Sequence, residues 1–149
     1  MDRQKVIDLA KSYASGGFLC SESVLLALSY FLGVRSELVP KIATGFGAGI
    51  GGQGMVCGAV SGAIMALGIE FGRNDVKKQE KKAYWFALDF LKRFENEHGF
   101  VTCRELTGCD FDKEEGRKKY EDEKMWETRC RQYIATASGI ASDLINERT

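Results

Sequence analysis

Apolar residues recur at steps of three and four through most of the chain, which is the spacing of an amphipathic α-helix. The first such segment predicts a helix over residues 2–14, which Gly16 ends. The second predicts a helix that opens at Cys20 or Ser21 and stops before Gly33. Both segments have a single apolar face, so each is expected to pack one side on a core.

Three more helices are predicted in the middle of the chain. Ser36 is expected to cap a short third helix, with Pro40 in its first turn. Residues 56–71 are apolar or small on nearly every face, which predicts a buried helix. Asp75 is expected to cap the next helix, which runs to about residue 97.

The C-terminal part predicts further helices. His98 and Gly99 mark a helix end, and residues 103–106 predict one helical turn. Eleven of the 13 residues over 112–124 are charged, which is typical of a solvated loop or an exposed helical segment. A final helix is predicted, and its buried side holds Trp126, Cys130, Tyr133, Ile134, Ala137, Ile140, Ala141 and Leu144.

No segment shows the alternating pattern of a strand, and no linker divides the chain. We therefore predict an all-α fold of one domain over residues 1–149. The architecture is a helical bundle of four main helices plus short helices, with a glycine-rich loop leading into a buried helix.

Charge and hydropathy exclude several classes of function. The 149 residues carry 21 basic and 21 acidic side chains, which argues against a nucleic-acid partner. The longest apolar run, residues 55–69, is too short to span a bilayer. The N-terminus lacks the apolar core of a secretory signal. We expect a cytoplasmic protein without membrane insertion.

Five cysteines are many for a reducing compartment. There they indicate catalytic, redox-active or metal-binding sites rather than permanent disulfides. The alternative is that cysteine serves only as a small buried apolar residue. The five positions are Cys20, Cys57, Cys103, Cys109 and Cys130.

The glycines are concentrated in one stretch, since eight of the 17 lie between residues 45 and 62. Residues 47–52 read GAGIGG and match a dinucleotide-binding string, but no strand is predicted before them, so we reject that site. Instead, the loop is expected to expose amide groups at the N-terminus of the following helix, beside Cys57. These amides are expected to lower the pKa of the Cys57 thiol. The candidate cofactor-binding residues are Gly45, Gly47, Gly49, Gly54 and Gly58.

Small residues also follow a helical spacing after this loop. Gly58 and Gly62 are four residues apart, as are Ala59 and Ala63. Rows of this kind allow a second helix backbone to approach closely. We expect close packing that would hold Cys57 rigidly.

Four cysteine-containing strings resemble a known family. The segment ATGFGAGIGGQGMVCGAVSGAIMALGIEFG holds a CGAxxG signature as CGAVSG, and FLCSESVL, HGFVTCRELTG and ETRCRQYIATAS surround the other cysteines. Together they resemble the C_GCAxxG_C_C family of redox-active proteins, over residues 9–144. Carried over by position, the family cysteines are Cys20, Cys57, Cys103 and Cys130, and Cys109 falls outside the pattern.

The resemblance implies a redox function through clustered thiols, by thiol–disulfide exchange or electron transfer. A second hypothesis is a non-catalytic module with the same four cysteines as metal ligands. A related domain occurs with split-Soret cytochromes, which favours a [2Fe–2S] cluster, and zinc ranks lower because closely spaced ligand pairs are absent. A third hypothesis is a structural helical protein with buried cysteines. Enzyme activity and the redox partner or small-molecule substrate stay open.

The four family cysteines are expected around one pocket, with the loop over residues 45–54 in its wall and Cys109 outside. Helix N-termini at Cys20 and Cys57 and the apolar face that carries Cys130 favour this convergence. His98, the only histidine, is expected to cap a helix or meet solvent, and metal ligation or proton transfer is the alternative.

The apolar character of residues 55–69 also bears on assembly. One chain of this length is not expected to cover the segment fully, which favours a homodimer. Its surface is predicted to use Trp85 or Trp126.

Overall fold

The computed structural model describes residues 1–147 and has the predicted all-α fold. Within these residues the body consists of five long helices, one more than predicted. They are α1 (Arg3–Ser15), α2 (Cys20–Phe31), α3 (Gly58–Phe71), α4 (Lys82–His98) and α7 (Arg131–Glu147). The shorter elements are the 3₁₀ helix η1 (Lys41–Phe46), α5 (Cys103–Thr107), α6 (Glu114–Asp122) and the π-helical segment η2 (Trp126–Cys130).

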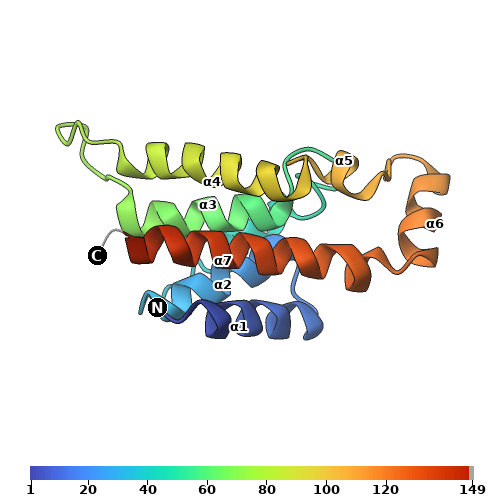
Figure 1. The fold of residues 1–149 in the computed structure, drawn as a ribbon, viewed down its shortest axis with the longest axis horizontal. Helices are drawn as coiled ribbons and strands as arrows, with labels where there is room; N and C mark the ends of the chain where they lie inside the picture. The colour runs from blue at the N-terminus through green and yellow to red at the C-terminus, as the bar shows by residue number, and fades with distance from the viewer. Residues whose placement is uncertain (148–149) are drawn as a thin grey trace.

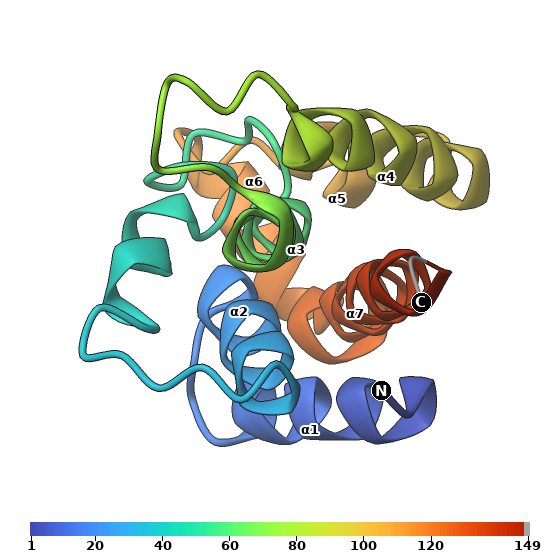
Figure 2. The same cartoon turned by 90° about the vertical axis from the view of Figure 1, so that its left-hand side faces the viewer.

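Helix α3 is the central element of the bundle. It packs against α2, α7 and α4, and α1 packs on the outer side of α2 and α7 (Figure 2). Figure 1 shows α5 and α6 together at one end of the long helices, whereas the N-terminus and the end of α7 lie at the other end. The large fully buried side chains include Phe90, Phe94, Leu25, Leu28 and Leu67.

Local capping signals account for several helix boundaries. The Asp2 carboxylate caps the start of α1 by accepting a hydrogen bond from the Lys5 amide at 3.2 Å, and α1 ends at Gly16. Gly99 ends α4 with a φ of 83°, a left-handed conformation that favours glycine. These boundaries and the short helix α5 confirm the sequence predictions.

Two boundaries were predicted wrongly. The Ser36 hydroxyl accepts from the Leu38 amide at 3.1 Å, but it closes only a turn, and the helix η1 begins after Pro40. Asp75 likewise caps a turn by accepting from the Lys77 amide at 2.9 Å. Residues 72–81 stay irregular and mostly exposed because they are highly polar and have little apolar surface to pack. Helix α4 therefore begins six residues later than expected, with Lys81 and not Asp75 at its N-cap.

Helices α2 and α3 approach each other closely at two glycines. A Cβ atom on Gly62 would overlap the carbonyl oxygen of Ser21. A Cβ atom on Gly58 would overlap Cys20 Sγ and would lie 3.0 Å from the carbonyl oxygen of Phe46. The prediction that small residues four apart allow a close helix contact is confirmed.

No helix within residues 1–147 is long and apolar enough to cross a membrane. A single chain buries most of α3, so this helix offers less uncovered apolar surface than the homodimer prediction assumed. Trp85 is 61% exposed on α4, whereas Trp126 lines a cavity and is partly buried. Of the two tryptophans, only Trp85 is well exposed for contact with a second chain, and the homodimer stays a prediction.

The contact between α2 and α3 predicts a contrast between two matched substitutions. Gly62→Ala should lower the free energy of unfolding by about 1–3 kcal/mol because its methyl group would displace the Ser21 backbone. Gly68→Ala in the same helix meets no atom within 4 Å, so it should leave stability unchanged or raise it by up to about 1 kcal/mol. Urea unfolding of both variants checks this, and equal effects would contradict it.

Candidate functional site

Backbone hydrogen bonds bring Cys57 and Cys103 together. The Cys57 amide donates to the Val101 carbonyl at 2.8 Å, and the Cys103 amide donates to the Met55 carbonyl at 2.7 Å. Between them, Val56 and Thr102 form an isolated antiparallel bridge. Two segments that are 46 residues apart in sequence therefore lie side by side, and each leads into a helix N-terminus.

Cys20 reaches the same region through the contact between α2 and α3. It is the first residue of α2, and its sulfur occupies the space that a side chain at Gly58 would fill. Glu22 holds this helix start in place. One of its carboxylate oxygens accepts from the Leu19 amide at 2.9 Å, and the other accepts from the Thr44 hydroxyl at 2.7 Å. Glu22 is thus a capping residue, as its first-turn position favours.

The fourth cysteine is held by contacts between α5 and the start of the last helix. The Tyr133 hydroxyl donates to the Leu106 carbonyl at 2.8 Å, and the Arg129 guanidinium donates to the same oxygen at 3.3 Å. Cys130 ends the π-helical segment, which closes when the Arg131 amide donates to the Trp126 carbonyl. Such π-helical segments are frequent at functional sites.

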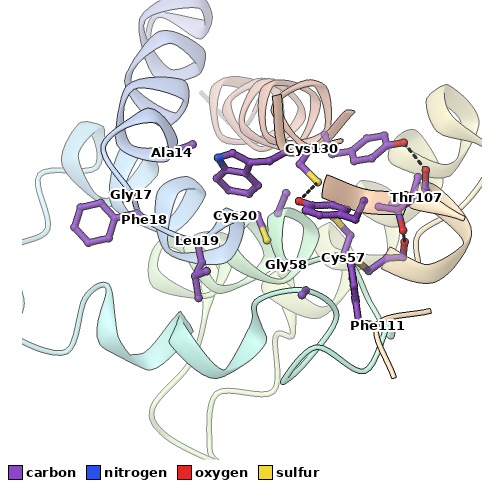
Figure 3. A pocket seen from close by; sticks show the side chains of 17 residues that line it. Ala14, Gly17, Phe18, Leu19, Cys20, Cys57, Gly58, Thr107, Phe111 and Cys130 are labelled. Carbon is purple, nitrogen blue, oxygen red and sulfur yellow. Dashed lines mark hydrogen bonds between the residues drawn. The ribbon is translucent and has the colours of Figure 1, made fainter. Parts of the chain in front are cut away.

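All four family cysteines line one cavity of about 380 Å³. Figure 3 shows Cys20, Cys57 and Cys130 approaching it from three different elements. Cys57 and Cys103 are buried, whereas Cys20 and Cys130 are partly exposed. All five cysteines of the chain are free thiols.

Cys109 is buried behind this cavity and does not line it. Its thiol donates to the Thr107 carbonyl at 3.5 Å and lies 3.7 Å from Met125 Sδ. The sequence expectation that Cys109 stands outside the group agrees with this arrangement. Although the sequence around it is polar, Cys109 is buried against Met125.

The glycine loop reaches the cavity through Ala48 and not through its glycines. Of the five candidate cofactor-binding glycines only Gly58 lines the cavity; Gly45, Gly47, Gly49 and Gly54 do not. Gly49 and Gly54 have φ values of 74° and 71°, and the Met55 amide donates to the Gly49 carbonyl at 2.9 Å. These glycines shape a tight loop.

Tyr120 is a cavity residue that the sequence analysis missed. It lies on α6, and its hydroxyl is 3.2 Å from Cys130 Sγ. Its ring meets Phe111 edge-on, with centroids 5.2 Å apart, and both rings line the cavity. The available signal was that Tyr120 is the only aromatic residue in the charged segment over 112–124.

Burial controls the ionisation of the inner thiols. It raises the pKa of Cys57 far above its usual range, and the neighbouring Cys20 thiolate would raise that pKa further, although the amides of Val60 and Ala59 oppose the shift. Burial also raises the pKa of Cys103 to about 12. The expectation that Cys57 is a low-pKa thiol was wrong, because its loss of hydration outweighs the helix N-terminus.

Burial also raises the thiol pKa values of Cys20 and Cys130, but hydrogen bonds to each sulfur oppose the increase. Burial raises the pKa of Cys20, while the amides of Ala48, Ser21 and Ala59 act against it. The Ala48 amide of the glycine loop therefore stabilises the thiolate of Cys20, and no loop amide acts in this way on Cys57. Burial raises the pKa of Cys130 to about 11, against a hydrogen bond from Tyr120 that favours the thiolate.

His98 lies outside the cavity. Its Nε2 atom is 2.9 Å from the Thr136 hydroxyl, and its ring meets Tyr133 edge-on with centroids 4.8 Å apart. Burial lowers its pKa. The histidine connects the end of α4 to α7, which is a structural role, and it does not line the thiol cavity.

The four thiols are suitable in type for iron or zinc, but their arrangement does not match a single-ion site. Among residues 1–147, no group of three or more histidine, cysteine, aspartate or glutamate side chains is positioned to hold a metal ion. The described arrangement therefore does not fit one metal ion held by all four cysteines.

The fold and cavity define a small all-α protein with a clustered-thiol site. The chain belongs to the C_GCAxxG_C_C family, since the family model described as "Putative redox-active protein (C_GCAxxG_C_C)" matches residues 18–144. This match confirms the resemblance. No curated protein and no solved structure matches the chain.

The contact with Tyr120 predicts the reactivity of Cys130. Tyr120→Phe removes a hydrogen bond that favours the thiolate, so the pKa of Cys130 should rise and its alkylation at fixed pH should slow about tenfold. Iodoacetamide labelling followed by peptide mass spectrometry measures this rate. Tyr84→Phe is the control, because Tyr84 is exposed on α4 and does not line the cavity. Equal rates in wild type and Tyr120→Phe would contradict the prediction.

The raised thiol pKa values predict a loss of stability in alkali. Above the pKa of about 8.5 in the unfolded chain, unfolding releases protons that the folded thiols retain, so the free energy of unfolding falls with rising pH. The slope is up to about 1.4 kcal/mol per pH unit for each such thiol, and the loss continues up to the folded pKa values. Urea unfolding between about pH 7 and 11 measures this slope. Cys103→Ser should reduce the slope, and an unchanged slope would contradict the assignment.

Proposed function

We propose that this chain is a dithiol–disulfide redox protein whose working groups are Cys20, Cys57, Cys103 and Cys130. The observation that carries the proposal is their convergence. Four cysteines from separate elements line one cavity, and the fifth cysteine of the chain does not. A structural role as buried core residues does not require four thiols to share a cavity, so this arrangement favours redox chemistry over core filling.

The cavity thiols differ in accessibility, and this difference suggests an order of reaction. Cys130 is partly exposed and in contact with Tyr120, so it is the proposed attacking thiol. Cys103 and Cys57 are buried and suit the role of resolving thiols, which are reached only from inside the cavity. Two thiols become one disulfide and release two electrons and two protons to an acceptor.

A cytoplasmic location is consistent with this function. A reducing compartment would return the disulfide to two thiols after each turnover. The alternative function, an iron–sulfur or zinc module, has the right ligand type, but no group of side chains in the described residues is positioned to hold a single metal ion such as zinc. No step of the proposed chemistry depends on a metal.

The proposal predicts a reversible disulfide among the cavity cysteines. In dithiothreitol redox buffers of increasing oxidised fraction, the protein should lose two or four free thiols, and peptide mapping should find the bond among the four. Cys109→Ser should retain this behaviour, because Cys109 does not line the cavity. Cys57→Ser and Cys130→Ser should lose part or all of it.

Other outcomes would overturn the proposal. No disulfide under any redox condition would exclude it, as would a bond that requires Cys109. Absorbance of anaerobically purified protein provides an independent measurement. Visible bands with stoichiometric iron and sulfide would favour the cluster module instead.

A further inference from the structure

The cavity that holds the thiols has an aromatic and uncharged lining. Its volume of about 380 Å³ falls in the range of small-molecule sites. Among residues 1–147, no lysine, arginine, histidine, aspartate or glutamate lines it. The rings that line it belong to Phe18, Phe111, Tyr120, Trp126 and Tyr133.

This lining selects against charged ligands. A carboxylate or phosphate in the cavity would lose its hydration without gaining a cationic partner, which is strongly unfavourable. The thiols add no charge at neutral pH, because burial raises the pKa of Cys103 to about 12 and of Cys130 to about 11. Nucleotides and glutathione are therefore poor occupants.

The size of the cavity also excludes the smallest oxidants as specific ligands. Water occupies about 30 Å³, and a peroxide molecule is little larger, so neither would fill this space or select its aromatic walls. Proteins cannot reach the inner thiols, since Cys57 is 7% exposed and Cys103 is 8% exposed. An uncharged, planar ring compound of small-molecule size fits both limits and can pack against the aromatic walls.

We propose that the cavity binds an uncharged quinone, which oxidises a pair of cavity thiols that includes Cys130. This inference rests on the proposed dithiol function and names its substrate class. In the reaction two S–H bonds break and one S–S bond forms. Both electrons and both protons pass to the quinone, whose two carbonyl oxygens become the hydroxyls of a hydroquinone. Quinone and hydroquinone are both uncharged, so neither form requires a counter-ion in the cavity.

Tyr120 is the proposed positioning residue for this ligand. The hydroxyls of Tyr133 and Thr107 donate to the carbonyls of Leu106 and Cys103, whereas the Tyr120 hydroxyl contacts Cys130 Sγ at 3.2 Å. While Cys130 is a neutral thiol, its S–H can donate to the Tyr120 oxygen, which leaves the Tyr120 proton for a quinone oxygen beside the reacting sulfur. Burial raises its pKa, which keeps it a hydrogen-bond donor.

Anaerobic stopped-flow mixing of the reduced protein with duroquinone tests the proposal. All four ring carbons of this probe that could accept a thiol are methylated, so its loss of absorbance reports reduction and not addition. One hydroquinone should form for each disulfide. A ring-sulfonated benzoquinone should react at least about tenfold more slowly, after correction for its potential, because its charge is excluded from the cavity.

Substitutions that fill or narrow the cavity test whether the quinone reacts inside it. Ala14→Phe fills the cavity from α1, and Leu19→Trp narrows its partly exposed edge if the first variant does not fold. Each should slow duroquinone reduction about tenfold or more, and Tyr120→Phe should slow it without filling the cavity. Tyr84→Phe is the matched control, because Tyr84 is 64% exposed on α4 and does not line the cavity.

The experiments distinguish failure of the quinone proposal from failure of the dithiol function. If the cavity disulfide forms in dithiothreitol buffer but duroquinone reacts equally with wild type and both cavity-blocking variants, the quinone proposal is wrong and the dithiol function stands. If no cavity disulfide forms under either condition, the dithiol function itself is wrong. Faster reaction of the sulfonated probe would also overturn the uncharged-ligand proposal.

Discussion

The site depends on one steric constraint, which is the absence of a side chain at Gly58. Cys20 Sγ occupies the space where a Cβ atom of residue 58 would lie. One turn later, the Ser21 carbonyl oxygen occupies the space where a Cβ atom of residue 62 would lie. The CGAVSG motif therefore has a physical meaning. Its cysteine caps α3, its first glycine admits a second sulfur, and its last glycine lets α2 approach closely enough to bring that sulfur in. A larger residue at Gly58 would displace Cys20 Sγ from its place beside the start of α3 and would also crowd the Phe46 carbonyl oxygen.

Sequence patterns predicted the helices whose boundaries are decided locally. Asp2, Gly16 and Gly99 act through hydrogen bonds or backbone conformations within a few residues, so their effects can be inferred without knowing the fold. Asp75 carries the same capping signal but closes only a turn, because the polar residues after it have no core to pack against. A capping residue permits a helix to begin, but tertiary packing decides whether the helix forms.

The candidate site was predictable in its members but not in its electrostatics. Family motifs identified the four cysteines, and the position of Cys130 on an apolar face indicated that it points inward. The pKa of Cys57 depends on burial from every side, which no local pattern contains. Tyr120 was hidden for a similar reason. It lies on a helix without buried residues, and only the return of α6 over the cavity brings its hydroxyl to Cys130.

The charge balance of the cavity connects these features to redox chemistry. Ionisation of Cys20 would raise the pKa of Cys57, and ionisation of Cys130 would raise the pKa of Cys103. Thiolates can therefore accumulate only with increasing difficulty, because each one opposes the next in an apolar space without cations. Disulfide formation avoids this repulsion, since two neutral thiols become one neutral bond when electrons and protons leave together. The same lining that makes isolated thiolates unfavourable thus favours a reaction in which the site is uncharged both before and after oxidation.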